Sequence, residues 1–426
     1  MQLTLAIHPI SEIRFDSKTH LNGATVCVSK EELRRLVLED SSFAGVDFEI
    51  ARPGESCRAG PVFDIVEPRA KGPDGSPDWP GILGAPETAG IGKTHVLEGT
   101  AVTLVRETSA GDSRGAVGYV LEMSGAPAQG SKYATLNHLI LVPHTRPELP
   151  EHARQRAYRV ALMKVAVCLG RAAFDATPTR TEALDISDSS ANDRAGLPRV
   201  AYVGQIFSRQ RKPQLDEPIL YGSDTDGMLP VALHPNEWLD GAVAPSYHCS
   251  LGGAETYFYQ NHPVIMELYR RHGAKELNFA GTVATIASAN NFERERNCRF
   301  AANLVKWALR ADAAILTKFG GGVPHTDLSE TARLLEGMGI KTAVQVTDLA
   351  RDRRVESALL FNFPEVNAIV CIGGNSTSWT VPRVERVIAA NSGLAEVLAG
   401  PFELESLNAV GVANQQGASR LRAMVY

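Results

Sequence analysis

The sequence predicts an α/β protein with a β-rich N-terminal part, followed by a C-terminal doubly wound, mostly parallel sheet with helices on both faces. Two observations support this fold class. Short apolar runs bounded by turn residues dominate residues 1–150, and strand-like and helix-like segments alternate after residue 250. Such alternation is typical of parallel sheets, because each parallel connection needs a crossover. With 426 residues, the chain is long enough for more than one domain.

The N-terminal part is expected to hold many strands and two helices. The first helix covers residues 30–40, with Ser29 as its N-cap, and the second covers residues 152–175, where apolar residues recur at helical spacing. Residues 71–91, dense in glycine and proline, and the polar residues 176–196 are expected to be loops. The expected strands are residues 3–7, 24–28, 46–51, 62–66, 94–105, 116–123, 136–142, 199–206 and 229–233.

The C-terminal part alternates between the two kinds of element. Helices are expected at residues 292–310 and 331–338, and strands at 278–288, 313–317, 341–346 and 368–372. Ligands of parallel sheets lie beyond the carboxyl ends of the strands. The Gly-rich loops 318–327 and 373–377 follow two such strand ends. Their backbone amides could bind an anion, or the glycines could merely satisfy turn geometry.

Charge and cysteine usage exclude several classes of protein. The net charge of −5 gives no basic surface for nucleic acid or for a membrane. No apolar run approaches the roughly 20 residues that span a bilayer, and the N-terminus lacks the pattern of a signal peptide. The six cysteines are scattered without a CxxC pair, which favours reduced thiols in a cytoplasmic protein. No metal site is expected.

Two cysteines have contrasting surroundings. Cys168 lies within the long predicted helix, and we expect it to be buried and inert. Cys249 lies in a Gly-rich polar segment between the two halves of the chain. By residue type alone, a lone cysteine is more often a small buried hydrophobic residue than a reactive one. The adjacent His248 points to the opposite face of an extended chain, so adjacency does not predict a thiolate pair.

Several short phrases occur in order along residues 1 to about 380. They are Glu49–Glu55, Asp64–Arg69, Lys93–Leu97, Met123–Gly125, Leu233–Ala242, Cys249, Tyr259–Ile265, Leu268–Gly273, Leu277–Phe279, Thr326–Leu328, Gly339–Thr342 and Gly373–Asn375. In this order they resemble the alpha/beta precursor of component B of the glycine, sarcosine and betaine reductases. The D-proline reductase precursor is a more distant resemblance.

The resemblance implies a covalent prosthetic group. In that family the precursor cleaves itself before a cysteine, which becomes a pyruvoyl group. Cys249 would then be the pyruvoyl precursor, His248–Cys249 the scissile bond, and residues 1–248 and 249–426 the two domains and future fragments. The pyruvoyl carbonyl captures a substrate amine as a Schiff base and acts as an electron sink.

The resemblance also implies a partner and a substrate class. A partner reductase subunit carries a selenocysteine or cysteine that attacks the α-carbon of a small amine or amino acid, such as glycine, and expels the amine. The chain would work in a hetero-oligomer. The site residues that follow, beyond Cys249 and His248, are Ser250, Thr256, Tyr257, Gly321, Gly322, His325, Asp327, Gly373, Gly374 and Asn375.

Two departures from the family pattern keep other functions open. A single cysteine follows His248, and His325 stands where the family phrase usually has an acidic residue. These departures motivate a second hypothesis, an unprocessed scaffold or binding subunit of a related reductase complex. A third hypothesis is an unrelated small-molecule enzyme that uses the Gly-rich loops of the C-terminal sheet.

Overall fold

The computed structural model describes residues 1–73, 75, 77–107, 118–186, 196–209, 217–246, 254–347, 363–366, 368–372 and 377–417. The N-terminal part holds two four-stranded sheets, with the strand orders β13-β1-β9-β8 and β5-β12-β10-β7. The first sheet is built from β1 (Leu3–Pro9), β8 (Arg69–Lys71), β9 (Gly92–Glu98) and β13 (Arg180–Leu184). The second is built from β5 (Phe43–Ala51), β7 (Val62–Val66), β10 (Thr100–Val105) and β12 (Asn137–Thr145).

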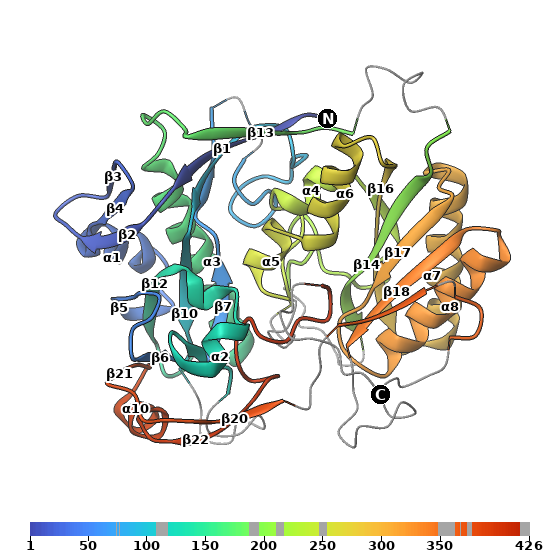
Figure 1. The fold of residues 1–426 in the computed structure, drawn as a ribbon. Coiled ribbons are helices and arrows are strands. Elements are labelled where there is room, and N and C mark those ends of the chain that lie inside the picture. Colours follow the sequence, from blue (N-terminus) through green and yellow to red (C-terminus); the bar gives the residue numbers. More distant parts are fainter. Residues whose placement is uncertain are drawn as a thin grey trace.

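The long helix α3 (Glu151–Arg171) connects these two sheets (Figure 1). Its apolar face, including Tyr158, Leu162 and Met163, belongs to the same core as residues of β5, β10 and β12. The helix α1 (Lys30–Leu38) packs nearby, and the Ser29 hydroxyl caps it by accepting from the Glu32 amide. Both helices and the Ser29 cap were predicted from the sequence, and the structure confirms them.

Smaller elements complete this part of the chain. A three-stranded sheet joins β2 (Glu12–Phe15), β4 (Thr25–Val28) and β3 (His20–Asn22), and another joins β11 (Leu121–Glu122), β6 (Cys57–Ala59) and β21 (Arg386–Ile388). A two-stranded sheet pairs β20 (Ser378–Val381) with β22 (Phe402–Glu405). The short helices here are α2 (Gly125–Gly130), η1 (Tyr133–Thr135) and α10 (Ser392–Ala399).

The largest sheet has six strands in the order β15-β16-β14-β17-β18-β19. All neighbours are parallel except β15 and β16. Because β14 pairs with both β16 and β17, the strand order reverses at β14, and the crevice beside this switch point is where such sheets bind ligands. The strands are β14 (Arg199–Arg209), β15 (Val231–Leu233), β16 (Asn278–Ser288), β17 (Ala313–Thr317), β18 (Lys341–Thr347) and β19 (Ala368–Ile372).

Helices cover both faces of this sheet. On one face α7 (Asn291–Asn303), its π-helical extension Leu304–Ala308 and α8 (Val323–Gly337) enclose a core that includes Val203, Val283 and Val344. On the other face α4 (Pro235–Leu239), α5 (Thr256–Gln260) and α6 (Pro263–Gly273) pack with Tyr202 and Ile286. The structure therefore confirms an α/β fold with a large, mostly parallel sheet, while the doubly wound arrangement and the 248/249 domain division stay predictions.

Four expected elements differ from the structure. The strand 94–105 is two strands in different sheets, because Gly99 turns the chain at φ +88° and its position leaves no room for a Cβ beside the Ile10 carbonyl. The loop 176–196 contains β13, which pairs antiparallel with β1. The helix expected at 331–338 begins at Val323, since Pro324 suits a first helical turn. Of the strand expected at 116–123, only β11 is formed among the described residues.

The chain crosses between its parts several times. The strands β14 and β15 precede residue 248, yet they pair with β16 in the large sheet. In the other direction, β21 returns to pair with β6 of the N-terminal part. Figure 1 shows α5 between the N-terminal sheets and the large sheet. No helix among the described residues is long and apolar enough to cross a membrane.

Candidate functional site

The predicted catalytic residues His248, Cys249 and Ser250 lie outside the described residues, which resume at Ala254. The chain on both sides of residues 247–253 is described, however, and it is held by one short stretch of the N-terminal part. We call this stretch, Asp64–Lys71, the clamp. It runs from the end of β7 through β8, and its charged side chains are buried.

The first clamp residue, Asp64, holds the chain just after residues 247–253. Its Oδ1 accepts hydrogen bonds from the amides of Ile65, at 2.8 Å, and Thr256, at 2.9 Å. Its Oδ2 accepts from the Thr256 hydroxyl at 2.5 Å and from the Arg159 guanidinium. Burial raises the pKa of the Asp64 carboxyl, whereas Arg159 and the Thr256 hydrogen bonds oppose that shift. Both carboxylate oxygens are thus fully used within the protein.

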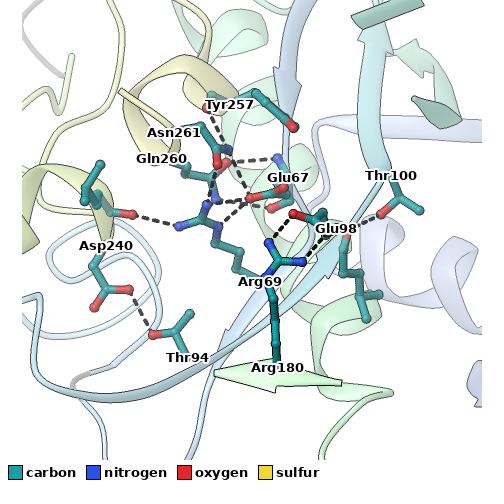
Figure 2. A network of polar contacts seen from close by, with 12 residues as sticks. Glu67, Arg69, Thr94, Glu98, Thr100, Arg180, Asp240, Tyr257, Gln260 and Asn261 are labelled. Carbon is teal, nitrogen blue, oxygen red and sulfur yellow. Dashed lines mark hydrogen bonds and ion pairs between the residues drawn. The ribbon is translucent and has the colours of Figure 1, made fainter. Parts of the chain in front are cut away.

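The middle of the clamp contacts the chain on both sides of residues 247–253 (Figure 2). The backbone of Glu67 makes two hydrogen bonds with the Gln260 side chain. The Glu67 amide donates to Gln260 Oε1 at 2.9 Å, and Gln260 Nε2 donates to the Glu67 carbonyl at 3.2 Å. The Arg69 guanidinium donates to Glu67, within the clamp, at 2.7 Å, and to the side chain of Asn261, which follows residues 247–253, at 3.0 Å. It also donates to the carbonyl of Leu239, which precedes residues 247–253, at 3.1 Å. Arg69 therefore joins the two flanks directly.

The last clamp residue, Lys71, holds the chain before residues 247–253. The Lys71 ammonium contacts the Asp240 carboxylate, and both side chains are almost fully buried. Asp240 also accepts from the Thr94 hydroxyl at 3.0 Å and from the Gly90 amide at 2.9 Å, as Figure 2 shows for Thr94. Burial lowers the pKa of Lys71, and the charge of Asp78 opposes that shift.

Buried charge is concentrated at the clamp. Among the described residues, ion pairs with both side chains less than a tenth exposed are Asp64–Arg159, Glu67–Arg69, Lys71–Asp240 and Arg58–Glu122. Three of these four pairs belong to the clamp. Removing two charges from water costs several kcal/mol per ion, and apolar residues would often give equal or greater stability. The concentration therefore indicates a role in placing the chain beside residues 247–253.

Two predicted site residues lie within this network. Thr256 and Tyr257 are buried at the start of α5. The Tyr257 ring packs edge-on against Tyr133 with ring centroids 5.4 Å apart, and its hydroxyl hydrogen-bonds Glu67. Burial raises the pKa of the Tyr257 hydroxyl far above its usual range. Sequence reasoning assigned no role to Asp64, Glu67 or Arg69, although these residues lie in the phrase Asp64–Arg69 that carries part of the family resemblance.

The other predicted site residues lie at the carboxyl edge of the large sheet. Gly321 and Gly322 connect β17 to α8, and Gly322 adopts φ +71°. His325 and Asp327 are buried in the first turns of α8 and do not lie in an open loop, because the helix begins at Val323. Burial lowers the pKa of His325 to about 4 and raises the pKa of Asp327 to about 8. Gly373, Gly374 and Asn375 lie outside the described residues.

A buried lysine that sequence reasoning missed lies at the same edge. Lys318 follows β17 directly, and its ammonium donates to the Gly320 carbonyl at 2.7 Å and to the Gln415 side chain at 3.3 Å. The Gly320 amide donates to the same Gln415 oxygen at 2.9 Å. Burial lowers the pKa of Lys318 to about 8. The position of a lysine directly after a buried parallel strand is the signal that could have found it.

A series of hydrogen bonds joins this edge to the segment that follows residues 247–253. The Tyr202 hydroxyl, on β14, lies 2.8 Å from His262 Nε2 and 2.6 Å from the Thr317 hydroxyl. The Thr317 hydroxyl donates to Gln416 at 3.4 Å. Residues 256–262 thus contact the clamp at one end and the switch point of the large sheet at the other.

One group of metal-ligand side chains is present among the described residues. Asp16, His20 and Cys27 have ligand atoms within 4.8 Å of one another. The Arg14 Nε lies 3.3 Å from the Cys27 sulfur, so a cation already faces this thiol. The group is also remote in the sequence from the clamp, and we assign it no metal.

Known proteins give a consistent picture. A family model of glycine/sarcosine/betaine reductase component B subunits matches residues 1–417. The chain is 29% identical over 440 residues to the glycine reductase complex component B subunits alpha and beta of Peptoclostridium acidaminophilum, with all of both chains covered. It is 31% identical over 403 residues to the betaine reductase complex component B subunit alpha of the same organism, with 93% of this chain and 89% of that protein covered.

A third relative is the sarcosine reductase complex component B subunit alpha of Peptoclostridium acidaminophilum, 29% identical over 443 residues and the full length of both chains. No solved structure matches the chain. The class defined by these matches is that of reductase component B subunits. The chain belongs to the glycine/sarcosine/betaine reductase component B family, as the ordered phrases predicted.

Proposed function

We propose that the protein is a subunit of a reductase complex that reductively cleaves the C–N bond of glycine or of an N-substituted amine. In this proposal a pyruvoyl group is made from Cys249 by self-cleavage of the His248–Cys249 bond. A partner subunit provides a selenol or thiol as the nucleophile. Membership of the component B family over residues 1–417 is the observation that carries the proposal.

The self-cleavage can be written with every atom accounted for. The Cys249 thiolate attacks the His248 carbonyl carbon, and the acyl group moves from nitrogen to sulfur. Loss of the α-proton of residue 249 then breaks its Cβ–Sγ bond, which leaves a thiocarboxylate on His248 and dehydroalanine at position 249. Hydrolysis of the dehydroalanine, through its imine form, releases ammonia and leaves the ketone. No oxidant or reductant is needed.

The described surroundings fit this chemistry. Asp64 and Arg159 hold Thr256, seven residues after Cys249, in a buried position through hydrogen bonds to its amide and its hydroxyl. When present, a pyruvoyl group supplies an electrophilic carbonyl that takes up an amine and withdraws electrons from its α-carbon. At the carboxyl edge of the large sheet, Lys318 offers a buried cation, which suits a substrate carboxylate.

The predicted substrate-lining residues stay part of the proposal. Gly321 and Gly322 would allow close approach of a ligand to the backbone, and His325 and Asp327 supply buried titratable groups beside it. The hydrogen bond between Tyr202 and His262 links this edge to the segment directly after α5, and through α5 to the clamp. A cut chain would also stay assembled, because β14 and β15 remain paired with β16 across the two fragments.

Intact mass tests the proposal. After co-expression with a partner subunit that carries the selenol or thiol, the chain should appear as two fragments, residues 1–248 and 249–426. The second fragment should react with phenylhydrazine and with borohydride. Cys249→Ala should leave the chain whole, while Cys168→Ala, a matched control on α3, should leave cleavage unchanged. An active complex that contains the whole chain with a titratable thiol at position 249 would favour the unprocessed scaffold subunit instead.

A further inference from the structure

We infer that the exposed side of α7 binds the partner subunit that carries the selenol or thiol, through an apolar partner surface bordered by acidic side chains. We call this side, formed by Phe292, Arg296, Arg299, Phe300 and Trp307, the α7 face. All of its residues are described. The inference rests on the proposed function and adds to it the place where the partner binds.

Large apolar side chains are exposed together on the α7 face. Phe292 is 85% exposed and Trp307 is 70% exposed, whereas no other large hydrophobic side chain of the described residues is more than 48% exposed. Phe300, on the same helix, is 38% exposed. Single exposed apolar residues are ordinary, but several large ones grouped on one surface mark a site of interaction. The grouping therefore indicates a surface that another protein covers.

Helical spacing places these residues on one side of α7. Counted from Phe292, the residues of the α7 face stand at i, i+4, i+7, i+8 and i+15, which lie within about 100° around a helix of 3.6 residues per turn. Ala301 and Val305, on the opposite side, are buried in the core that α7 and α8 enclose against the large sheet. Figure 1 shows α7 on the side of that sheet that faces away from the N-terminal sheets.

The length of the α7 face suits a protein partner. At a rise of 1.5 Å per residue, Phe292 and Trp307 lie roughly 20 Å apart along the helix. A standard interface buries about 800 Å² on each partner and is wide enough to span this distance. Arginine, tryptophan and phenylalanine are also the residue types enriched at such interfaces.

The two arginines of the α7 face indicate that the partner is acidic there. Arg296 Nε donates to the Asn297 side chain at 3.1 Å, while Arg296 Nη2 has no hydrogen-bond partner among the described residues. Neither Arg296 nor Arg299 forms an ion pair within the described part of the chain. Carboxylates of a bound protein would give both guanidiniums the charge-assisted hydrogen bonds that they lack here.

Acidic side chains close to the α7 face already have other partners. Glu293 accepts from the Ser288 hydroxyl at 2.7 Å. Glu330, which also experiences the charge of Arg299, is bonded through both oxygens to Arg333. Glu295 is the exposed acid that remains on this helix. The two arginines therefore outnumber the acids that are free to answer them.

A second copy of this chain fits the α7 face poorly. In a symmetric pair the same surface meets itself, so Arg296 and Arg299 would face identical arginines. Like charges brought together across an interface cost several kcal/mol and suppress the association. A different protein, with acidic groups around an apolar centre, covers the aromatic rings and answers both charges.

The place of the α7 face in the fold explains why the nucleophile-bearing partner would bind it. The strand β16 ends at the carboxyl edge of the large sheet, and α7 begins directly after it. Asn290 caps the helix by accepting from the Phe292 amide at 2.9 Å, so Phe292 is held at that edge. Arg294, on the same turn, lies 3.9 Å from the Asp327 carboxylate. A protein on the α7 face therefore borders the edge where the substrate is proposed to lie.

The test measures the affinity of the full chain for the partner subunit that carries the selenol or thiol. Trp307→Ala should weaken binding by about 30-fold and Phe292→Ala by about tenfold, as expected for aromatic anchors of an interface. Both variants should leave the melting temperature unchanged, because the rings are exposed. The control is Val397→Ala on α10, a 48% exposed position that should keep the affinity within about twofold of wild type.

A charge variant tests the acidic character of the partner. Arg299→Glu should weaken binding by about tenfold at low salt and should reduce the salt dependence of the association rate. Loss of fold alone would not change that dependence. Arg35→Glu on α1, where the side chain is 75% exposed, is the matched control and should stay within about twofold of wild type.

The outcomes separate the α7 face from the proposed function. If the wild-type chain binds the partner and Trp307→Ala and Arg299→Glu bind as tightly as their controls, the α7 face is not the binding surface and the proposed function stands. If the wild-type chain alone forms a dimer in sedimentation that Trp307→Ala abolishes, the surface belongs to a second copy. If the wild-type chain binds no subunit with a selenol or thiol, the proposed function fails and the α7 face with it.

Discussion

Removal of the arginine from the buried Asp64–Arg159 pair should destabilise the protein strongly. In Arg159→Met the Asp64 carboxylate stays buried, with Thr256 and two backbone amides as its remaining donors. Breaking one side of a buried ion pair costs about 3–5 kcal/mol, because the other charge is left uncompensated. The hydrogen bonds that remain should hold the cost near the lower end, at about 3 kcal/mol.

The assay is urea unfolding of the uncut chain in a Cys249→Ala background, so that unfolding is unimolecular. Arg180→Met is the matched control, because Arg180 pairs with Glu98 through two contacts of 2.7 and 2.8 Å, but with the two side chains 45% and 43% exposed. Exposed pairs contribute about 0–1 kcal/mol. The double variant Asp64→Asn/Arg159→Met should cost less than the sum of the two single variants.

The pH dependence gives a second check on the same pair. Burial raises the pKa of Asp64 and Arg159 lowers it, so in Arg159→Met only the raising effect and the hydrogen bonds remain. The buried carboxyl then protonates more readily, and the cost of Arg159→Met should shrink as the pH falls from 7 to 5. A cost no larger than that of Arg180→Met at pH 7 would refute the reasoning about buried charge.

Three further predictions concern packing, pH and thiol reactivity. Gly170→Ala should destabilise the protein by about 1–3 kcal/mol in thermal unfolding, because the added Cβ would lie 2.5 Å from the β8 backbone. The control is Gly337→Ala, which should be neutral or stabilising because no atom lies within 4 Å of the added Cβ. Burial raises the pKa of Asp327 to about 8, against about 3.9 in an unfolded chain, so the folded state binds the extra proton. This carboxyl therefore contributes stability that falls as the pH rises from 4 to 8, and Asp327→Asn should remove that contribution. A stability difference between wild type and Asp327→Asn that stays constant over this pH range would contradict the assignment. Burial raises the pKa of Cys298 to about 12 and also raises the pKa of Cys168, which is half-buried and not fully buried as expected. Maleimide labelling of the folded chain at pH 7 should therefore be slower at Cys298 than at Cys168, and faster labelling at Cys298 would contradict this order.

The sequence predicted the repeating elements of the large sheet closely. The strands 278–288, 313–317 and 368–372 have the predicted limits, because each is an apolar or β-branched run between turn residues. The helix α8 was predicted too short, since the Gly-rich segment before it was predicted to continue as a loop through Asp327. The strand β13 was missed because its residues are mostly polar, and it forms only because β1 offers a paired edge.

The sequence by itself determined the α/β class, the long helix and the family, because these depend on local patterns of polarity and on the order of short phrases. Only the tertiary structure decided what the phrase Asp64–Arg69 does. Asp64 contacts Thr256 across 192 residues of chain, and Glu67 contacts Gln260 across 193. Local periodicity in the sequence indicates which side chains are buried. The partner of a buried charge is fixed by long-range packing, so no pattern within either segment predicts which residue that partner is.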